Sequence, residues 1–201
     1  MDHFRAKFRI NLRPSFTVID NFIQCEDALE RLRNHALQED YESASAYYKG
    51  RRTFRTFRTE ELKLAFERIL NGKISDWDHP ANGMNGKLQF CTADTPLVYH
   101  RDSLNYAGIL YLTPDAPFST GTTLYAHKET KLRSVPDDRR AEVFSGGFFD
   151  KTKFEPVDVI GNVYNRLFLF DATNIHAASC YFGKDVTDSR LFQIFFFNLD
   201  N

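Results

Sequence analysis

The second half of the chain consists of short apolar segments separated by turn-forming residues, and this pattern restricts the fold more than any other feature. The candidate strands span 87–91, 95–102, 106–113, 121–127, 157–160, 166–170, 175–181 and 190–198. Several are rich in aromatic and β-branched residues, which favour strands. Many short strands with turn signals between them are typical of a β-sandwich or β-barrel. We therefore predict a β-rich core that begins near residue 87.

The first part of the chain has a different, helical pattern. Segment 15–23 resembles a strand that runs into a turn. Apolar residues recur at helical spacing in 26–38, which predicts an amphipathic helix. A second helix is predicted to begin after a capping Thr59 and to end at Asn71-Gly72, a typical stop signal. Helices gathered ahead of the strands indicate the α+β class.

The length of 201 residues suits one domain, which would bury roughly 70% of the surface of its unfolded chain. No repeat or linker divides the sequence, so we expect a single domain over 1–201, with helical support in 1–86 and the strand core in 87–201. The net charge of −1 argues against a nucleic-acid partner. No apolar stretch approaches the roughly 20 residues that span a bilayer, which argues against a membrane partner.

The cysteines and the N-terminal residues bear on the compartment. Cys25, Cys91 and Cys180 are widely spaced and odd in number, which disfavours a disulfide framework. The first residues, Met-Asp-His-Phe-Arg-Ala-Lys-Phe-Arg, lack the apolar core of a signal peptide. We expect a cytoplasmic protein with reduced thiols, in which Cys91 and Cys180 are small core residues.

One short motif carries metal-binding chemistry. His100 and Asp102 are two residues apart, so on an extended strand both side chains would project from the same face. A second imidazole, His176, follows the apolar run Leu-Phe-Leu-Phe at 167–170. Two histidines and one carboxylate on one side of a metal leave the opposite positions open, which is the ligand set of non-haem Fe(II) oxygenases. We therefore predict that His100, Asp102 and His176 form a metal site.

Taken together, these features resemble the Fe(II)/2-oxoglutarate-dependent dioxygenases, with the prolyl-hydroxylase-like branch as the nearest. The resemblance covers most of the chain, but only a few motifs carry specific information. They are His100-Arg-Asp102, Gly121-Thr-Thr-Leu-Tyr125, Asn165-Arg-Leu-Phe-Leu-Phe-Asp171 leading to His176, and Ser189-Arg190-Leu191. The resemblance implies a double-stranded β-helix, the jelly roll also found in cupins, preceded by supporting helices.

The resemblance also implies an activity. In this family the two histidines and the carboxylate hold Fe(II), and a basic residue some ten to fifteen positions after the distal histidine holds the far carboxylate of 2-oxoglutarate. Arg190 follows His176 by 14 positions. A guanidinium matches a carboxylate bidentately, and a buried one needs an anionic partner. With O2, 2-oxoglutarate would yield succinate and CO2 as the substrate is hydroxylated, and the carboxylate of Asp102 favours hydroxylation over halogenation.

Two other classes of function stay open at the level of sequence. One is a cupin-like metal enzyme that does not use 2-oxoglutarate, which would have no need for Arg190. The other is a non-catalytic cupin-like module that binds a metal or ligand. Arg190 itself has an alternative role, because it could pair with Asp171 or Asp188 on the surface. His127, Tyr111 and Tyr125 are interpreted as structural residues, and Asp171 as a turn or supporting group.

The substrate is not encoded in any motif, and small molecules and peptidyl groups such as prolyl residues are compatible with the site. Segment 39–58 is polar and aromatic, and we interpret it as a loop. We predict that 47–58, with its aromatic residues Tyr47, Tyr48, Phe54 and Phe57, forms a lid over the iron. In that lid Arg51, Arg52 or Arg55 would touch the substrate. The charged insertion at 128–156, with a short helix near 136–144, is the other candidate for substrate selection.

Overall fold

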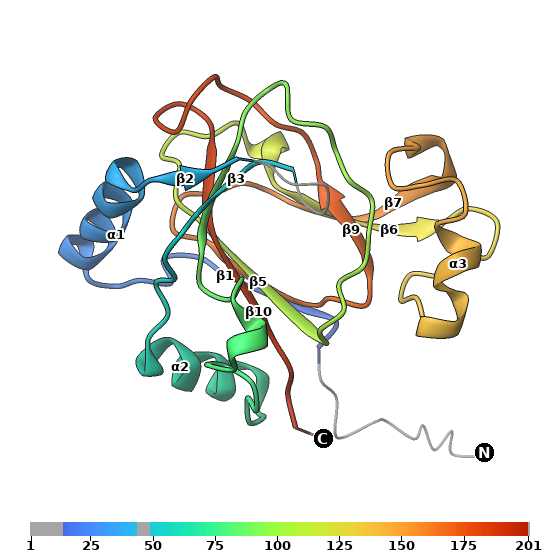
Figure 1. Cartoon of the computed structure of the whole chain (residues 1–201), viewed down its shortest axis with the longest axis horizontal. Helices are drawn as coiled ribbons and strands as arrows, with labels where there is room; N and C mark the ends of the chain where they lie inside the picture. The colour runs from blue at the N-terminus through green and yellow to red at the C-terminus, as the bar shows by residue number, and fades with distance from the viewer. Residues whose placement is uncertain (1–13, 44–48, 201) are drawn as a thin grey trace, which may run out of the picture.

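The computed structural model describes residues 14–43 and 49–200, and two antiparallel sheets facing each other form its centre (Figure 1). The larger sheet has the order β1-β8-β5-β10-β4-β3-β2 and the smaller one β7-β6-β9. The strands of the larger sheet are β1 (Phe16–Ile19), β2 (Tyr41–Glu42), β3 (Arg51–Thr53), β4 (Leu88–Cys91), β5 (Tyr106–Tyr111), β8 (Leu167–Asp171) and β10 (Arg190–Phe197). Those of the smaller sheet are β6 (Thr122–His127), β7 (Phe154–Ile160) and β9 (Ile175–Ala178). This arrangement confirms the predicted jelly-roll core and α+β class.

Alternation along β10 shows how the sequence forms both a core and a cavity. Because successive side chains of a strand point to opposite faces, every second residue faces the same way. Leu191, Phe195 and Phe197 pack on the outer side of the sheet, in the cluster that contains the helices. Arg190 and Phe192 lie on the other face, between the two sheets, where they line a cavity. The continuous apolar run of β10 is therefore explained by burial on both of its faces.

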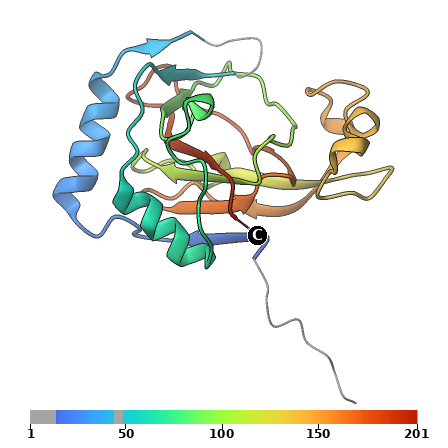
Figure 2. The same cartoon turned by 60° about the horizontal axis from the view of Figure 1, so that its bottom comes forward.

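Two helices cover the outer face of the larger sheet, as Figures 1 and 2 show. They are α1 (Glu26–Gln38) and α2 (Glu60–Leu70), and both lie within the ranges predicted. Thr59 caps α2 by accepting a hydrogen bond from the backbone N–H of Leu62 at 3.3 Å. Phe66 of α2 anchors the helix, with its ring centroid 4.9 Å from that of Phe195.

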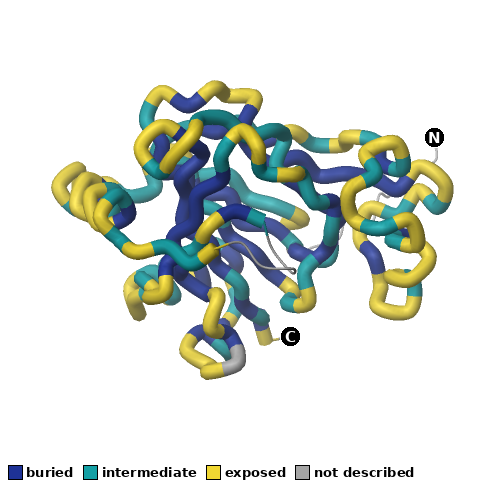
Figure 3. The backbone as a smooth tube through the Cα atoms, turned by 45° about the horizontal axis from the view of Figure 1, so that its top comes forward, coloured by how far each residue is buried: buried dark blue, intermediate teal, exposed yellow. Residues whose placement is uncertain are grey.

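The insertion at 128–156 covers the outer face of the smaller sheet. It contains the 3-10 helix Asp137–Arg139, the short helix α3 (Arg140–Val143) and the 3-10 helix Lys151–Lys153, so the predicted short helix is present. Val143 packs in a cluster with Tyr125 of β6 and Ile175 of β9. Figure 3 shows the buried strands at the centre and the exposed residues concentrated in the outer segments. The remaining 3-10 helices are Pro80–Asn82 and Phe118–Thr120.

Two predicted segments differ in the structure. Segment 39–58 is not simply a loop, because β2 pairs with β3 and β3 pairs with β4. Such short, polar edge strands form by continuing the hydrogen bonds of a neighbouring strand, and their own sequence carries no apolar alternation. Segment 95–102 forms no ladder, and only His100 bridges to His176. Pro96 cannot donate a backbone hydrogen bond, which disfavours regular pairing there.

The larger sheet also recruits strands from both parts of the sequence. Strands β1, β2 and β3 precede residue 87 and extend the sheet formed by the later strands. None of the helices in 14–43 and 49–200 has the length and apolar character needed to cross a membrane. Tyr47 and Tyr48 of the predicted lid lie outside the described residues.

Candidate metal centre

His100 and His176 are brought together by backbone pairing. The N–H of His100 donates to the carbonyl of His176 at 3.1 Å, and the N–H of His176 donates to the carbonyl of His100 at 2.8 Å. Directly opposed residues of an antiparallel pair project to the same face. The two rings accordingly lie side by side, with centroids 4.3 Å apart. Residues 76 positions apart in the sequence thus form one imidazole pair.

Each imidazole is fixed in orientation by its own backbone neighbourhood. Nδ1 of His100 lies 3.0 Å from the carbonyl oxygen of Val98, and Nδ1 of His176 lies 2.9 Å from that of Asn174. A carbonyl can only accept, so each Nδ1 carries the proton. In the neutral ring the lone pair is then on Nε2, which is the arrangement of metal-binding histidines whose other nitrogen is hydrogen-bonded.

Asp102 completes the group. Its backbone N–H donates to the carbonyl of Ala172 at 2.9 Å, which holds the residue beside the end of β8. Oδ1 lies 3.4 Å from Nε2 of His100, and Oδ2 lies 3.4 Å from Nε2 of His176. The buried Oδ2 makes no hydrogen bond in the described structure. A buried acceptor without a donor is costly, and a cation bound by the three residues would satisfy it.

The electrostatics of the group favour a charged carboxylate. Burial on its own raises the pKa of the Asp102 carboxyl, but the adjacent His176 and His100 hold that pKa well below its usual range. Burial lowers the pKa of His100, but the carboxylate of Asp102 outweighs this and raises it. Asp102 is therefore an anionic oxygen donor at neutral pH.

The three side chains fit one metal ion. Their ligand atoms all lie within 4.8 Å of one another. Metal–ligand bonds of about 2.0–2.6 Å require the donors on one cation to lie within about 5 Å of each other. Two imidazole nitrogens and one carboxylate oxygen suit a divalent first-row metal such as Fe(II).

An inner cavity of about 100 Å³ connects this group to Arg190. The cavity lies between the sheets and is lined by His100, Asp102 and His176 as well as by Arg190 and Thr122. Arg190 begins β10, and its side chain is held by a hydrogen bond from Nε to the carbonyl of Thr120 at 2.9 Å. A second bond runs from its Nη2 to Oγ1 of Thr122 at 3.1 Å.

The guanidinium of Arg190 is buried without an anionic partner among the described residues. Only 2% of the residue is exposed. Nη2 also donates to the carbonyl of Gly121 at 3.4 Å. Aromatic rings flank the guanidinium, with the ring centroid of Phe192 4.3 Å from Cζ and that of Tyr111 5.4 Å away. The two acids that could have paired with it are engaged elsewhere: Asp171 accepts from Thr173, and Asp188 accepts from the backbone of residues 184 and 185. A surface ion pair therefore does not account for Arg190.

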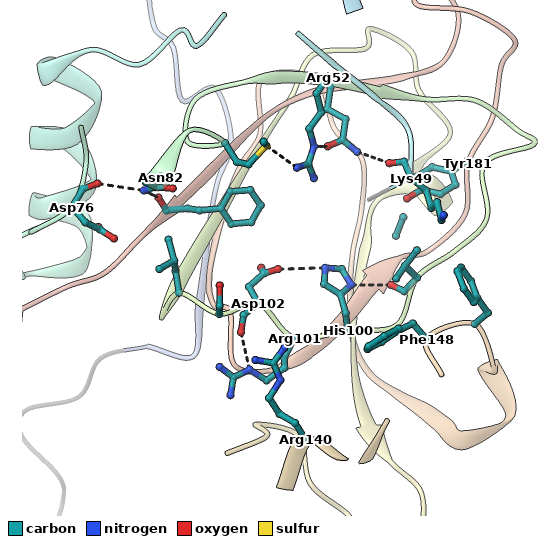
Figure 4. A pocket seen from close by; sticks show the side chains of 18 of the residues that line it. Lys49, Arg52, Asp76, Asn82, His100, Arg101, Asp102, Arg140, Phe148 and Tyr181 are labelled. Atoms are coloured by element: carbon teal, nitrogen blue, oxygen red, sulfur yellow. Dashed lines mark hydrogen bonds and ion pairs between the residues drawn. The ribbon is translucent and has the colours of Figure 1, made fainter. Parts of the chain in front are cut away.

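His100, Asp102 and His176 are called the metal group below. A larger outer pocket of about 1000 Å³ opens beside this group (Figure 4). His100 and Asp102 line both the inner cavity and this pocket, so the group lies where the two meet. Walls of the outer pocket come from β3, from the segment after β4 and from the insertion at 128–156.

The three arginines predicted to touch substrate occupy different places. Arg52 lines both cavities and donates from Nε to Oε1 of Gln89 at 2.6 Å. Arg51 is exposed and lies over the ring of Phe90, 6.0 Å from its centroid. Arg55 is exposed and pairs with Glu39 at 2.8 Å. The structure therefore brings only Arg52 of the three to the pocket.

The residues interpreted as structural lie away from the metal group or support it. His127 is buried, and its Nδ1 lies 3.0 Å from Oγ1 of Thr130. Tyr125 packs against Tyr99 in the cluster under the insertion. Tyr111 places its hydroxyl 2.8 Å from Oγ1 of Thr122, next to Arg190. Asp171 caps a turn at Thr173, which confirms one of its two predicted roles.

Gln89 and Tyr181 are among the cavity residues that sequence reasoning missed. Both line the inner cavity and the outer pocket. Burial, together with the neighbouring Cys91, raises the pKa of Tyr181 beyond its usual range, so the phenol stays neutral. Gln89 could have been found, because a glutamine between buried apolar residues of a strand needs a polar partner. Tyr181 lies after the end of β9, where no periodicity marks it.

Comparisons with known proteins support the fold. Neither family models nor curated proteins give a match. Among solved structures, HygX from Streptomyces hygroscopicus with nickel and 2-oxoglutarate bound has a TM-score of 0.50 and 14% identity, over 90% of this chain and 82% of that one. A Pseudomonas putida prolyl-4-hydroxylase has a TM-score of 0.49 and 10% identity over 93% and 94% of the two chains. A Trichoplax adhaerens prolyl hydroxylase, in complex with a hypoxia inducible factor peptide fragment, has a TM-score of 0.49 and 13% identity, over 91% of this chain and 83% of that one.

At this level of identity the likeness concerns the fold, and it agrees with the resemblance inferred from the sequence motifs. Two antiparallel sheets, with a histidine pair bridging β9 to the segment after β4, form the frame of the site. The chain therefore has the double-stranded β-helix fold that it shares with HygX, whose structure holds nickel and 2-oxoglutarate.

Proposed function

We propose that this protein is an Fe(II)- and 2-oxoglutarate-dependent dioxygenase that hydroxylates its substrate. The observation that carries the proposal is the pairing of two features across one cavity. The metal group lines the inner cavity. The buried guanidinium of Arg190, which has no anionic partner among the described residues, lines the same cavity. A dianion with a metal-chelating end and a distant carboxylate fits both features.

The residues have separate roles in this proposal. His100, Asp102 and His176 would hold Fe(II), and Arg190 would bind the 5-carboxylate of 2-oxoglutarate. Bound iron and 2-oxoglutarate would supply the oxidation: one atom of O2 would enter the substrate as a hydroxyl, and the other would enter 2-oxoglutarate, which would leave as succinate and CO2. Nine apolar or aromatic residues of the inner cavity, such as Phe170, Phe192 and Ile194, exclude water from it.

The orientation of the ligands is fixed before any metal binds. The carbonyls of Val98 and Asn174 hold the Nδ1 protons, so both Nε2 lone pairs face the metal position. Preorganised donors lose little freedom on binding, which favours affinity and a defined geometry. A cation held by these three residues on one side would keep its other positions for 2-oxoglutarate and O2.

A succinate assay tests the proposal. Purified protein supplied with Fe(II), 2-oxoglutarate and O2 is expected to release succinate, slowly alone and faster with extracts that contain the substrate. The Asp102→Ala variant is expected to release none. Binding of metal without binding of 2-oxoglutarate would favour the cupin-like enzyme that does not use it. Absence of metal binding would favour a non-catalytic module that binds another ligand.

A further inference from the structure

We infer that the substrate carries an anionic group, a carboxylate or a phosphate, which binds Arg52, and an apolar body that packs against Phe148, Phe149 and Phe196. This inference rests on the proposed function and names the class of substrate for that same site. It depends on the outer pocket alone, whereas the proposed function depends on the metal group and on Arg190.

The outer pocket is locally basic in a chain that is almost neutral. Four basic side chains line it, against two acidic ones, although the whole chain has 26 Lys and Arg and 27 Asp and Glu. The basic residues are Lys49, Arg52, Arg101 and Arg140, and the acidic ones are Asp76 and Asp102. A cavity lined mainly by one sign of charge concentrates ligands of the opposite sign.

Both acids of the lining already have partners within the protein. Both carboxylate oxygens of Asp76 accept hydrogen bonds from Asn198, one from its backbone N–H at 2.7 Å and one from Nδ2 at 3.0 Å. Asp102 faces the two histidines. The lining therefore carries more basic than acidic side chains, which disfavours a positively charged substrate.

Arg52 is the basic residue best placed for a substrate next to the metal. The register of β3 and β4 sets Arg52 opposite Gln89 and Arg51 opposite Phe90, so alternation sends the two arginines to opposite faces of the sheet. Gln89 accepts from Nε of Arg52 at 2.6 Å, and Sδ of Met84 lies 3.2 Å from Nη1 of Arg52. Figure 4 shows Arg52 on the wall across the pocket from His100 and Asp102.

Arg101 and Arg140 are less suitable. Arg101 is buried and donates to the backbone carbonyls of Asp102 and Val135, while it also pairs with Asp137 at 2.9 Å. Arg140 lies 3.8 Å from the same Asp137. Arg52 instead lies on the wall across the pocket from His100 and Asp102, and the amide of Gln89 and the thioether of Met84 help to orient it. A guanidinium held in this way presents a planar donor surface that suits carboxylate and phosphate alike.

The apolar part of the pocket comes from aromatic residues at its mouth. Phe148 and Phe149 are 44% and 56% exposed, which is unusual for such large apolar side chains. Phe148 is nevertheless held in place, because its carbonyl accepts from the N–H of Tyr99 at 2.7 Å and its ring centroid lies 5.4 Å from that of Phe144. Nζ of Lys49 lies 5.9 Å from the ring centroid of Phe149. Anchored, exposed aromatic side chains beside a cavity are typical of a ligand contact.

Three probes that differ only in their head group test the inference. They are 3-phenylpropanoate, 2-phenylethyl phosphate and 3-phenylpropanamide, titrated anaerobically into protein saturated with Mn(II) and 2-oxoglutarate. Saturating 2-oxoglutarate fills the inner cavity, so the probes report on the outer pocket. At least one anionic probe is expected to bind about tenfold or more tightly than the amide, the order that a charge-assisted pair contributes. The better anion identifies the group as carboxylate or phosphate.

Variants assign the preference to Arg52. Arg52→Gln is expected to abolish the difference between the anionic probe and the amide, whereas Arg55→Gln, on the outside and paired with Glu39, keeps it. Equal binding of all three probes, or no binding, overturns the inference. Retention of the preference in Arg52→Gln overturns the role of Arg52. If the wild-type protein does not bind 2-oxoglutarate at all, the proposed function fails first, and this outcome is separate from the others.

Discussion

The surroundings of Arg190 show how one residue can define a ligand. A fully buried guanidinium is expensive unless a negative charge compensates it. Here it is held by the carbonyl of Thr120, the hydroxyl of Thr122 and the faces of aromatic rings, all of which orient it but carry no charge. Such a site lacks a compensating negative charge among the described residues, and the carboxylate of a ligand would supply one.

Replacement of Arg190 by lysine is expected to raise the KM for 2-oxoglutarate about tenfold or more, because a bidentate pair becomes a single contact. At saturating 2-oxoglutarate the rate should fall much less. Succinate release against 2-oxoglutarate concentration measures both. Arg166→Lys is the matched control, since Arg166 pairs with Asp20 outside the cavities. An unchanged KM in Arg190→Lys would show that Arg190 has a structural role.

Asp102 is the only anionic donor of the metal group, and its removal tests the group directly. Asp102→Ala is expected to weaken Mn(II) binding by more than about 100-fold, since loss of a supporting residue alone costs 10–100-fold. Calorimetric titration measures the affinity, and circular dichroism checks that the fold is retained. Asp94→Ala, at an exposed turn acid, should leave the affinity unchanged. Equal Mn(II) affinity in both variants would place the metal elsewhere.

At the scale of elements, the C-terminal end of α2 is tied to the next segment by a buried acid. Glu67 accepts from the backbone N–H of Ile74 at 2.9 Å and from Nζ of Lys73 at 2.8 Å. The hydrogen bond from Lys73, together with that of Ile74, lowers the pKa of the Glu67 carboxyl. These contacts fix the turn that follows α2 and thereby the helix that packs on the larger sheet.

Because the pKa of Glu67 is lowered in the folded protein, its contribution to the free energy of unfolding depends on pH. The ionised form of Glu67 is favoured by folding, so its stabilisation is present above the unfolded value of 4.5 and is lost as the pH falls through the lower folded value. Glu67→Gln is expected to reduce the free energy of unfolding by about 1–2 kcal/mol near pH 7. The difference from wild type should shrink near pH 3. Urea denaturation at the two pH values measures it, and a pH-independent difference would contradict the assignment.

Elements with local sequence signals could be predicted, whereas elements that form only by pairing with a neighbouring strand could not. α2 was predicted because Thr59 and Asn71-Gly72 mark its ends, and β10 because of its apolar run. β3 was not predicted, because it forms by pairing with the edge of β4. For the same reason the choice among Arg51, Arg52 and Arg55 could not be made from composition.

The candidate site shows the same division. His100, Asp102, His176 and Arg190 stood out by residue type and spacing, and the structure brings all four to one cavity. Their roles as ligands remain predictions. The strand expected to carry His100 and Asp102 is instead a single bridge, stabilised by the backbone of residue 176. Tyr181 was missed because its place in the cavities depends on the path of the chain after β9.

At the scale of the whole molecule, three apolar layers hold the site. One lies between the larger sheet and the helices, one between the sheets and one under the insertion. The two cavities meet at the metal group within this frame. Because His176 lies on β9, and the backbones of His100 and Asp102 are hydrogen-bonded to His176 and Ala172, the site is expected to be formed before the metal binds. Metal and 2-oxoglutarate should therefore stabilise the whole fold by binding to its native state.

Thermal unfolding can separate the two ligands. At about 100 times its Kd a ligand adds about 2.7 kcal/mol to the free energy of unfolding, which corresponds to roughly 5–10 °C in Tm for a chain of this size. Mn(II) is expected to raise the Tm, and 2-oxoglutarate to raise it further only when Mn(II) is present, since its chelating end needs the metal. Arg190→Met should keep the first shift and lose the second, whereas Asp102→Ala should lose both. A shift with 2-oxoglutarate that persists in Arg190→Met would contradict its proposed position, because the charge that holds its far carboxylate would then lie elsewhere.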